Sequence, residues 1–75
     1  MKYLTGQPEK GKKYRVEYNG EQIYDASIVE HDGGCWAKVK VENTLPSKME
    51  KHYHYKEGME FDIKLGYYNL LIIEE

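Results

Sequence analysis

Two short turn signals constrain the fold of this chain more than any other feature of its sequence. The Asn-Gly pair at 19–20 and the Asp-Gly-Gly run at 32–34 each favour a hairpin, because these residues tolerate the backbone angles of tight turns. The flanking segments alternate apolar and polar residues with a period of two, as half-buried strands do. We therefore expect an antiparallel meander of three strands, formed by the segments 12–18, 22–31 and 35–42.

Alternation also predicts which side chains of the meander point inward. The first and third segments each have one mainly apolar face and one mainly charged face. The inward set is Tyr14, Val16 and Tyr18 in the first segment and Cys35, Ala37, Val39 and Val41 in the third. The outward set is Lys13, Arg15, Glu17, Trp36, Lys38, Lys40 and Glu42. Because Cys35 is in register with small apolar residues, we expect it to be buried rather than reactive.

The C-terminal half of the chain repeats part of this pattern. Residues 9–18 and 56–65 each contain a charged pair, a glycine, two spacer residues, an aromatic residue and then alternating aliphatic residues. The glycines, Gly11 and Gly58, are expected to permit a sharp turn into a bent strand. A reversal at Gly66 then leads into a final strand that is apolar on both faces. The inward set of the second repeat is Met59, Phe61, Ile63 and Leu65.

The segment between the two halves has two alternative conformations. Ser47 and Glu50 have the spacing of a helix capping box, which predicts a short helix over 47–55. The run His-Tyr-His-Tyr at 52–55 alternates with a period of two, which predicts a strand instead. The sequence leaves both conformations open.

Short strands, tight turns and the lack of a long helical pattern indicate an all-β fold. A small, strongly twisted sheet hides its edges by curling into a barrel. The strand order is similar in architecture to the five- or six-stranded antiparallel barrels called SH3-like and Tudor-like. An oligonucleotide-binding (OB-like) barrel is the alternative if 47–55 is helical. We expect a single barrel domain over 11–75, after a lead-in segment over 1–10 that packs on the barrel or adds a short strand.

Composition limits the classes of function. A chain of 75 residues buries only about 60% of its unfolded surface, which leaves little room for a deep catalytic pocket. The net charge of −2 lacks the strongly basic balance of a dedicated nucleic-acid-binding protein. One cysteine excludes an internal disulfide and fits a reducing compartment. No apolar run is long enough for a signal peptide or a membrane span, so we expect a cytoplasmic location and no membrane contact.

The signals for catalysis and metal binding are weak. His52 and His54 share a face if their segment is extended, but zinc needs a third and usually a fourth ligand. Two solvated histidines are the simpler interpretation, and the sequence leaves their metal binding open. No phosphate-binding glycine loop and no nucleophile motif is recognisable. We therefore expect a protein that is not an enzyme and has no cofactor.

The outer face of the third segment carries the clearest binding signal. Trp36 lies beside Lys38 and Lys40, while Lys13 and Arg15 lie on the outer face of the first segment. Aromatic residues among cations bind single-stranded nucleic acid, and exposed aromatic residues also make hot spots for proteins. We predict a protein partner, with a homodimer through the final strand as one form of contact, and nucleic acid as the alternative. Further contact candidates are Tyr53, Tyr55 and Tyr67.

Overall fold

The computed structural model describes residues 1–45 and 55–73, which form six β-strands in one antiparallel sheet. No helix occurs in these two ranges. The prediction of an all-β fold is therefore confirmed. The strands are β1 (Lys2–Tyr3), β2 (Lys13–Tyr18), β3 (Glu21–His31), β4 (Trp36–Thr44), β5 (Glu60–Lys64) and β6 (Asn69–Ile72).

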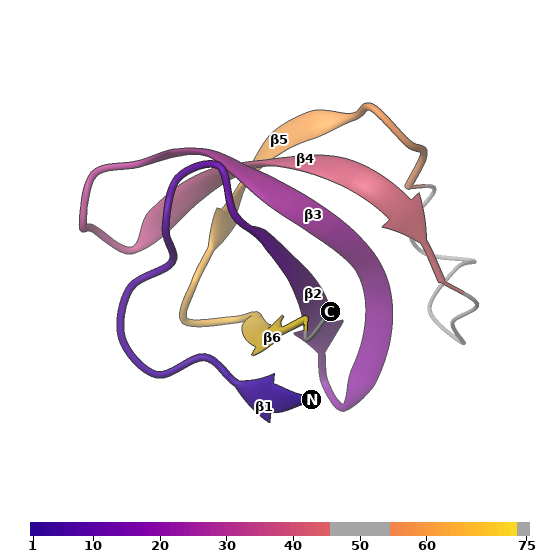
Figure 1. Cartoon of the computed structure of the whole chain (residues 1–75), viewed down its shortest axis with the longest axis horizontal. Coiled ribbons are helices and arrows are strands. Elements are labelled where there is room, and N and C mark those ends of the chain that lie inside the picture. The colour runs from indigo at the N-terminus through magenta and orange to yellow at the C-terminus, as the bar shows by residue number, and fades with distance from the viewer. Residues whose placement is uncertain (46–54, 74–75) are drawn as a thin grey trace.

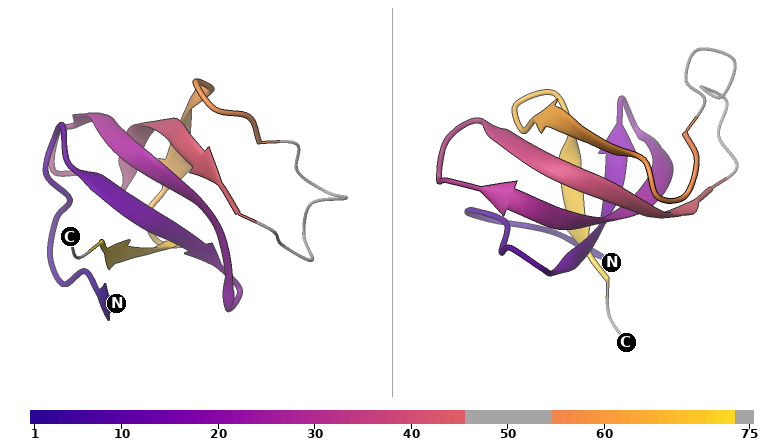
Figure 2. Two further views of the ribbon diagram at one scale, coloured as in Figure 1. Left: turned by 45° about the vertical axis from the view of Figure 1, so that its right-hand side comes forward. Right: turned by 90° about the horizontal axis from the view of Figure 1, so that it is seen from above.

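The order of the strands across the sheet is β1-β6-β2-β3-β4-β5. Strands β2 to β5 follow one another as a meander, and β6 returns to lie between β2 and β1 (Figure 1). The long strand β3 bends, and the sheet curls around one face, as Figure 2 shows from two sides. It does not close, because β1 and β5 remain its edges among the described strands. This open, barrel-like sheet agrees with the predicted small antiparallel barrel.

The predicted turns connect the strands of the meander. Asn19 and Gly20 join β2 to β3 with φ angles of 52° and 84°, which lie in the left-handed region that asparagine and glycine tolerate best. Gly33, with φ of 92°, lies in the loop between β3 and β4. Local turn chemistry therefore explains the three-strand meander.

Gly11 and Gly58 occupy equivalent turns, as the sequence repeat suggests. Both have φ in the left-handed region, at 84° and 89°. The Gly11 N–H donates to the carbonyl oxygen of Ile28 at 2.7 Å, and the Gly58 N–H donates to that of Val41 at 2.7 Å. The residue after each glycine accepts a hydrogen bond from the same partner. The Ile28 N–H donates to the carbonyl oxygen of Lys12 at 3.0 Å, and the Val41 N–H donates to that of Met59 at 2.8 Å. The repeat is thus one local structure used twice, a glycine bulge that leads into β2 and into β5.

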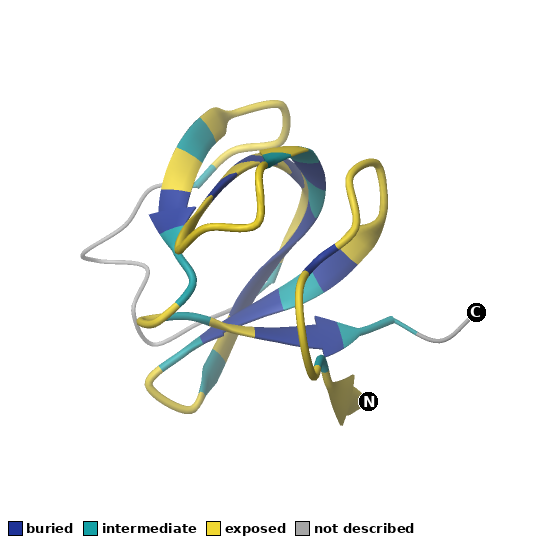
Figure 3. Cartoon of the chain, turned by 90° about the vertical axis from the view of Figure 1, so that its left-hand side faces the viewer, coloured by how far each residue is buried: buried dark blue, intermediate teal, exposed yellow. Residues whose placement is uncertain are grey.

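The core lies on the inner face of the curled sheet. Along β4, for example, buried positions that face the core alternate with exposed positions that face outward (Figure 3). The middle of β3 is buried at four consecutive positions, and the register of this strand with β4 shifts in the same region. The buried hydrophobic residues are Tyr14, Val16, Ile23, Tyr24, Ala26, Ile28, Ala37, Val39, Val41, Ile63, Leu70 and Leu71.

Two predictions of inward-pointing side chains are wrong, and both fail at the end of a strand. Cys35 is exposed, because it lies in the loop just before β4 begins at Trp36. Met59 is also exposed, just before β5 begins at Glu60. Alternation continues through the sequence at these positions, but no neighbouring strand covers a side chain beyond the end of the sheet.

Glu17 is an error of the opposite kind. The sequence predicts that this side chain points outward into water, but it is only 6% exposed. The Tyr3 hydroxyl lies 3.1 Å from both carboxylate oxygens, and the Asn69 side-chain amide donates to one of them at 3.2 Å. The hydrogen bond that the Tyr3 hydroxyl donates to Glu17, together with the negative charge of that carboxylate, raises the pKa of Tyr3. Strand β1 therefore covers a polar position of β2 and satisfies it.

The start of the lead-in segment is part of the sheet. Lys2 pairs with Ile72 and Tyr3 with Leu71, and the Leu4 N–H donates to the carbonyl oxygen of Leu70 at 2.7 Å. We predicted a homodimer contact through the final strand, β6. One edge of β6 is paired with β1 within the chain, and its other edge is paired with β2. The predictions for His52, Tyr53 and His54 fall outside the described residues, and so does the choice between helix and strand over 47–55, except for its last residue, Tyr55.

Candidate partner-binding surface

Trp36 is the most prominent side chain on the outer face of the sheet. It is the first residue of β4, where the inward positions are Ala37, Val39 and Val41, so its own side chain points outward. The indole remains 56% exposed, and its cross-strand neighbour on β5 is Lys64. An aromatic surface of this size left in water is a feature of binding sites. The predicted exposure of Trp36 is confirmed.

Tyr67 lies close to the same end of β5. It follows the strand in the turn to β6, is 67% exposed, and has the Lys64 ammonium 5.2 Å from its ring centroid. The Leu65 N–H donates to the carbonyl oxygen of Cys35 at 2.7 Å, which ties this turn to the loop before β4. We call Trp36, Lys64 and Tyr67 the aromatic end of the sheet. Lys64 was not a candidate in the sequence, because only the pairing of β4 with β5 places it opposite Trp36.

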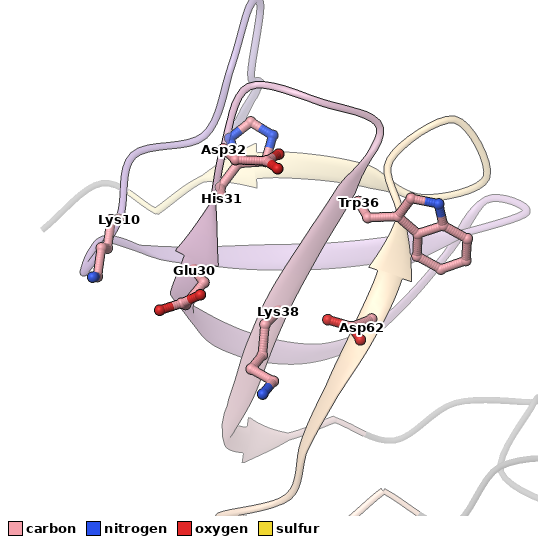
Figure 4. Close-up of a pocket in the computed structure, with 7 residues that line it drawn as sticks. All are labelled: Lys10, Glu30, His31, Asp32, Trp36, Lys38 and Asp62. Atoms are coloured by element: carbon pink, nitrogen blue, oxygen red, sulfur yellow. The ribbon is translucent and has the colours of Figure 1, made fainter.

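A pocket of about 440 Å³ lies beside Trp36 (Figure 4). Lys38 lies between Glu30 of β3 and Asp62 of β5 in the register of the sheet. Three carboxylates and two lysines line the pocket, so cations and anions are interleaved and the carboxylates are in slight excess. We call it the mixed-charge pocket, and its lining residues are Lys10, Glu30, His31, Asp32, Trp36, Lys38 and Asp62.

The other predicted cations do not join Trp36. Lys40 lies four residues further along β4, about 13 Å away at about 3.3 Å per residue. It is flanked by Ser27 and Glu60, and Lys13 lies on the far side of Ser27. Lys13 and Lys40 are exposed, as predicted, but they form a separate row on the outer face.

Arg15 has a structural role. Its guanidinium donates to both oxygens of Asp25, at 2.8 and 3.2 Å, and to the side-chain oxygen of Gln22 at 3.2 Å. The hydrogen bonds that Arg15 donates to Asp25 raise the pKa of Arg15, even though partial burial opposes the charge. Asp25 is buried, so Arg15 serves mainly to neutralise it.

The predicted tyrosine contacts divide in the same way. Tyr67 belongs to the aromatic end, whereas Tyr55 packs against Tyr24 and Phe61, with ring centroids 4.6 and 5.6 Å apart. Tyr55 is therefore part of the packing at the margin of the core. Tyr53 lies outside the described residues.

The part of the chain that the structure describes contains no group of three or more histidine, cysteine, aspartate or glutamate side chains arranged to hold a metal ion. It also contains no helix that is long and apolar enough to cross a membrane. The mixed-charge pocket contains His31, but that ring lies 3.0 Å from the carbonyl oxygen of Gly34 in the same loop.

Comparisons with known proteins give one partial likeness. No family model matches the chain, and no solved structure matches it. A stretch of 33 residues is 42% identical to part of elongation factor P from Parvibaculum lavamentivorans. This stretch covers 44% of the present chain and 18% of that factor, so the likeness is one of a segment and the chain spans less than a fifth of the relative's length.

Proposed function

We propose that this protein is a non-enzymatic binding module that recognises a protein partner through the aromatic end and the mixed-charge pocket. The observation that carries the proposal is the exposed Trp36 at the margin of an open pocket lined by both signs of charge. Aromatic residues surrounded by polar and charged side chains are typical of the hot spots at protein interfaces. Interleaved charges suit a partner that itself carries both signs.

Single-stranded nucleic acid is the second candidate. Trp36 and Tyr67 are both exposed next to Lys64, an arrangement in which bases stack on rings and a cation meets a phosphate. The segment similar to a protein named elongation factor P is compatible with work in translation. Against this candidate, Glu30 and Asp62 flank Lys38, so a polyanion would meet carboxylates beside the aromatic end.

The test is a pull-down with the tagged full chain from its native cells, with and without nuclease, followed by reconstitution with the purified partner. We expect a protein that is retained after nuclease treatment and binds directly in reconstitution. Trp36→Ala should weaken that binding by about tenfold or more, because it removes the exposed ring. Thr44→Ala, an exposed position at the other end of β4, is the matched control and should leave affinity unchanged.

Salt dependence separates the two candidates. Binding to nucleic acid falls steeply with salt, because lysines release the counterions of phosphates, whereas a protein contact with mixed charges falls less. Recovery of nucleic acid alone, with steep salt dependence, would overturn the proposed protein partner. Full binding by Trp36→Ala with an unchanged unfolding midpoint would show that the partner docks elsewhere.

A further inference from the structure

Strand β5 leaves one edge of the sheet open among the described residues. It pairs with β4 on one side, and no described strand pairs with its other side, so it forms one margin of the sheet (Figure 1). β5 has five residues, whereas β1, at the opposite margin, has two. Unpaired strand edges present N–H and C=O groups to a strand of another chain. β5 is therefore the longer of the two edges at which a further strand can be added.

The hydrogen bonds beyond the two ends of β5 show which of its backbone groups face this edge. The Val41 N–H of β4 donates to the carbonyl oxygen of Met59 at 2.8 Å, and the Leu65 N–H donates to that of Cys35 at 2.7 Å. In an antiparallel pair, residues that bond to the neighbouring strand alternate with residues whose backbone groups point away from it. The residues of β5 whose backbone groups point toward the open edge are therefore Glu60, Asp62 and Lys64.

Most of these backbone groups have no hydrogen-bond partner within the described chain. The Lys64 carbonyl oxygen accepts from the Tyr67 N–H at 3.0 Å, in the turn after the strand. Neither the Lys64 N–H nor the backbone of Glu60 and Asp62 has a partner in the described ranges on this side of β5. These groups are the donors and acceptors that an added strand would use.

The charges on the outer face of β5 indicate which side chains such a strand carries. Glu60 and Asp62 are exposed, and neither carboxylate has an ion-pair partner among the described side chains. On β4, the residues opposite them are Lys40 and Lys38, so the sheet already places lysines on one side of this acidic pair. An added strand lies next to the carboxylates and about 10 Å from those lysines, so the nearer, negative charges dominate. Basic residues therefore fit opposite Glu60 and Asp62.

The other positions of β5 complete the pattern. An acidic residue fits opposite Lys64, because opposite charges stabilise directly facing positions of an antiparallel pair. On the inner face, Ile63 is buried and Phe61 packs against the core, so apolar residues fit opposite both. From its N-terminus, the added antiparallel strand then has the order acidic, apolar, basic, apolar, basic.

A second copy of β5 does not match this pattern. If two copies paired antiparallel over the whole strand, the two Asp62 side chains would face each other, and like charges at directly opposite positions are destabilising. A strand with the complementary order has no such conflict at any of the three charged positions. The charges of the edge therefore favour a strand of a different protein.

We propose that the partner protein adds an antiparallel strand of this charge pattern to the open edge of β5. The inference rests on the proposed function, because it specifies how a protein partner contacts the surface near Trp36. Lys64 lies opposite Trp36, so the added strand lies two strands from the indole, about 10 Å away. The proposal adds a class of ligand, a strand of alternating charge, and a contact region that the sequence did not indicate.

Hydrogen exchange in the full chain tests whether the edge is open. We expect fast exchange at the Glu60 and Asp62 amides and slow exchange at those of Phe61 and Ile63, which bond to β4. Slow exchange at Glu60 and Asp62 at every protein concentration would mean that the chain itself covers the edge. Slow exchange only at high concentration would mean that a second copy occupies it. Either result would overturn the proposal.

Two peptides with glycine-serine ends test the charge pattern, one with the centre Glu-Val-Lys-Val-Lys and one with Glu-Val-Glu-Val-Glu. We expect the first to shift the NMR signals of the Glu60, Asp62 and Lys64 amides saturably at millimolar concentration. The second should bind about tenfold more weakly, because it places like charges opposite Glu60 and Asp62 in either strand direction. Equal affinities, or no saturable shifts with the first peptide, would overturn the proposal.

Variants at Asp62 separate the backbone contact from the charge. Asp62→Asn should weaken the first peptide severalfold, and Asp62→Pro should abolish its binding, because proline removes the N–H at the open edge without breaking a bond to β4. Asp62→Lys keeps that N–H and should shift the preference toward the second peptide, which tests the proposal even if the proline variant is unstable. Glu42→Gln, exposed on β4 beyond its pairing with β5, is the matched control and should change nothing.

The failure of this inference can be distinguished from the failure of the proposed function. If the reconstituted protein partner is lost with Trp36→Ala but binds fully to Asp62→Pro and Asp62→Lys, the protein-binding function stands and the added strand is wrong. If no protein binds and an oligonucleotide instead shifts the Trp36 indole signal, both are wrong. Unfolding midpoints of all variants, measured in parallel, exclude loss of binding through loss of fold.

Discussion

Glu17 shows how one carboxylate links a terminal strand to the rest of the sheet. The alternation of β2 assigns this residue to the wet face, yet Tyr3 and Asn69 cover it and provide its hydrogen bonds. A buried carboxylate is tolerated when such partners replace water. Sequence periodicity cannot show this, because the partners come from segments 14 and 52 residues away.

Tyr3→Phe should loosen β1 from β6. The substitution keeps the ring and removes the hydroxyl that contacts Glu17. We expect faster hydrogen exchange at the Leu4 amide, whose bond to Leu70 reports the docking of this strand. Tyr67→Phe, which removes an exposed hydroxyl in the turn after β5, is the control. Unchanged protection of Leu4 would mean that pairing of the backbones alone holds β1.

The same contact predicts a dependence on pH. Because Glu17 raises the pKa of Tyr3 above the ordinary value of 10.0, the folded chain holds this proton more tightly than the unfolded chain. The contribution of Tyr3 to stability is therefore complete below about pH 10 and is lost as the pH rises through the raised pKa. An NMR titration of the Tyr3 ring should show the raised pKa, and Glu17→Gln should return it toward 10. A titration unaffected by Glu17→Gln would contradict the contact.

Tyr24 presents the opposite case, a polar atom in the core without a hydrogen-bond partner among the described residues. Burial, followed by the neighbouring tyrosines Tyr55 and Tyr68, raises its pKa far above the usual range. Tyr24→Phe should stabilise the fold by about 1 kcal/mol, because it removes a buried, unsatisfied hydroxyl and keeps the ring contacts. Urea denaturation measures this difference. A loss of stability would reveal a partner for the hydroxyl.

At the scale of the elements, the two glycine bulges are the clearest repeated structure. Each places a glycine with positive φ two residues before a strand. The N–H of that glycine donates to a carbonyl oxygen of the neighbouring strand, Ile28 of β3 or Val41 of β4. The sequence repeat predicted this equivalence correctly, because a bulge depends on local residues. The Asn-Gly turn and the β3–β4 loop were predictable for the same reason.

Gly11→Ala and Gly58→Ala should therefore destabilise the fold by similar amounts, about 1 kcal/mol each, since alanine is strained at positive φ. Gly66→Ala is the control, because its backbone is outside the left-handed region and its Cβ would be free of contacts; we expect a change within about 0.5 kcal/mol. Thermal or urea unfolding gives all three values. A large difference between Gly11 and Gly58 would show that the bulges are equivalent in shape only.

At the scale of the whole molecule, the pairing of distant strands determines what the sequence could not show. β6 lies between β1 and β2, although more than 50 residues separate it from both in the chain. That arrangement buries Glu17, and it pairs with β1 the edge of β6 at which we predicted a homodimer contact. Likewise, only the pairing of β4 with β5 brings Lys64 and Asp62 to Trp36. The outward face of β4 was predictable from alternation, whereas the composition of the surface around it was not.

Removal of residues 1–3 should expose the edge of β6 and promote self-association. Unpaired strand edges template contacts with other chains, and here the exposed strand is apolar on both faces. Sedimentation velocity should show a monomer for the full chain and concentration-dependent dimers or larger species for the truncated one. If the truncated chain remains monomeric at high concentration, β1 is not what protects the edge of β6 from pairing with another chain.

The position of β6 between β1 and β2 also sets an order of events during synthesis on the ribosome. The meander from β2 to β5 can form in the order in which its strands emerge, because each strand pairs with the one made just before it. β1 and the open side of β2 must wait for a strand that ends at Ile72. Since long-range pairing is slow, the nascent chain carries an incomplete sheet, with one side of β2 unpaired, until that strand emerges.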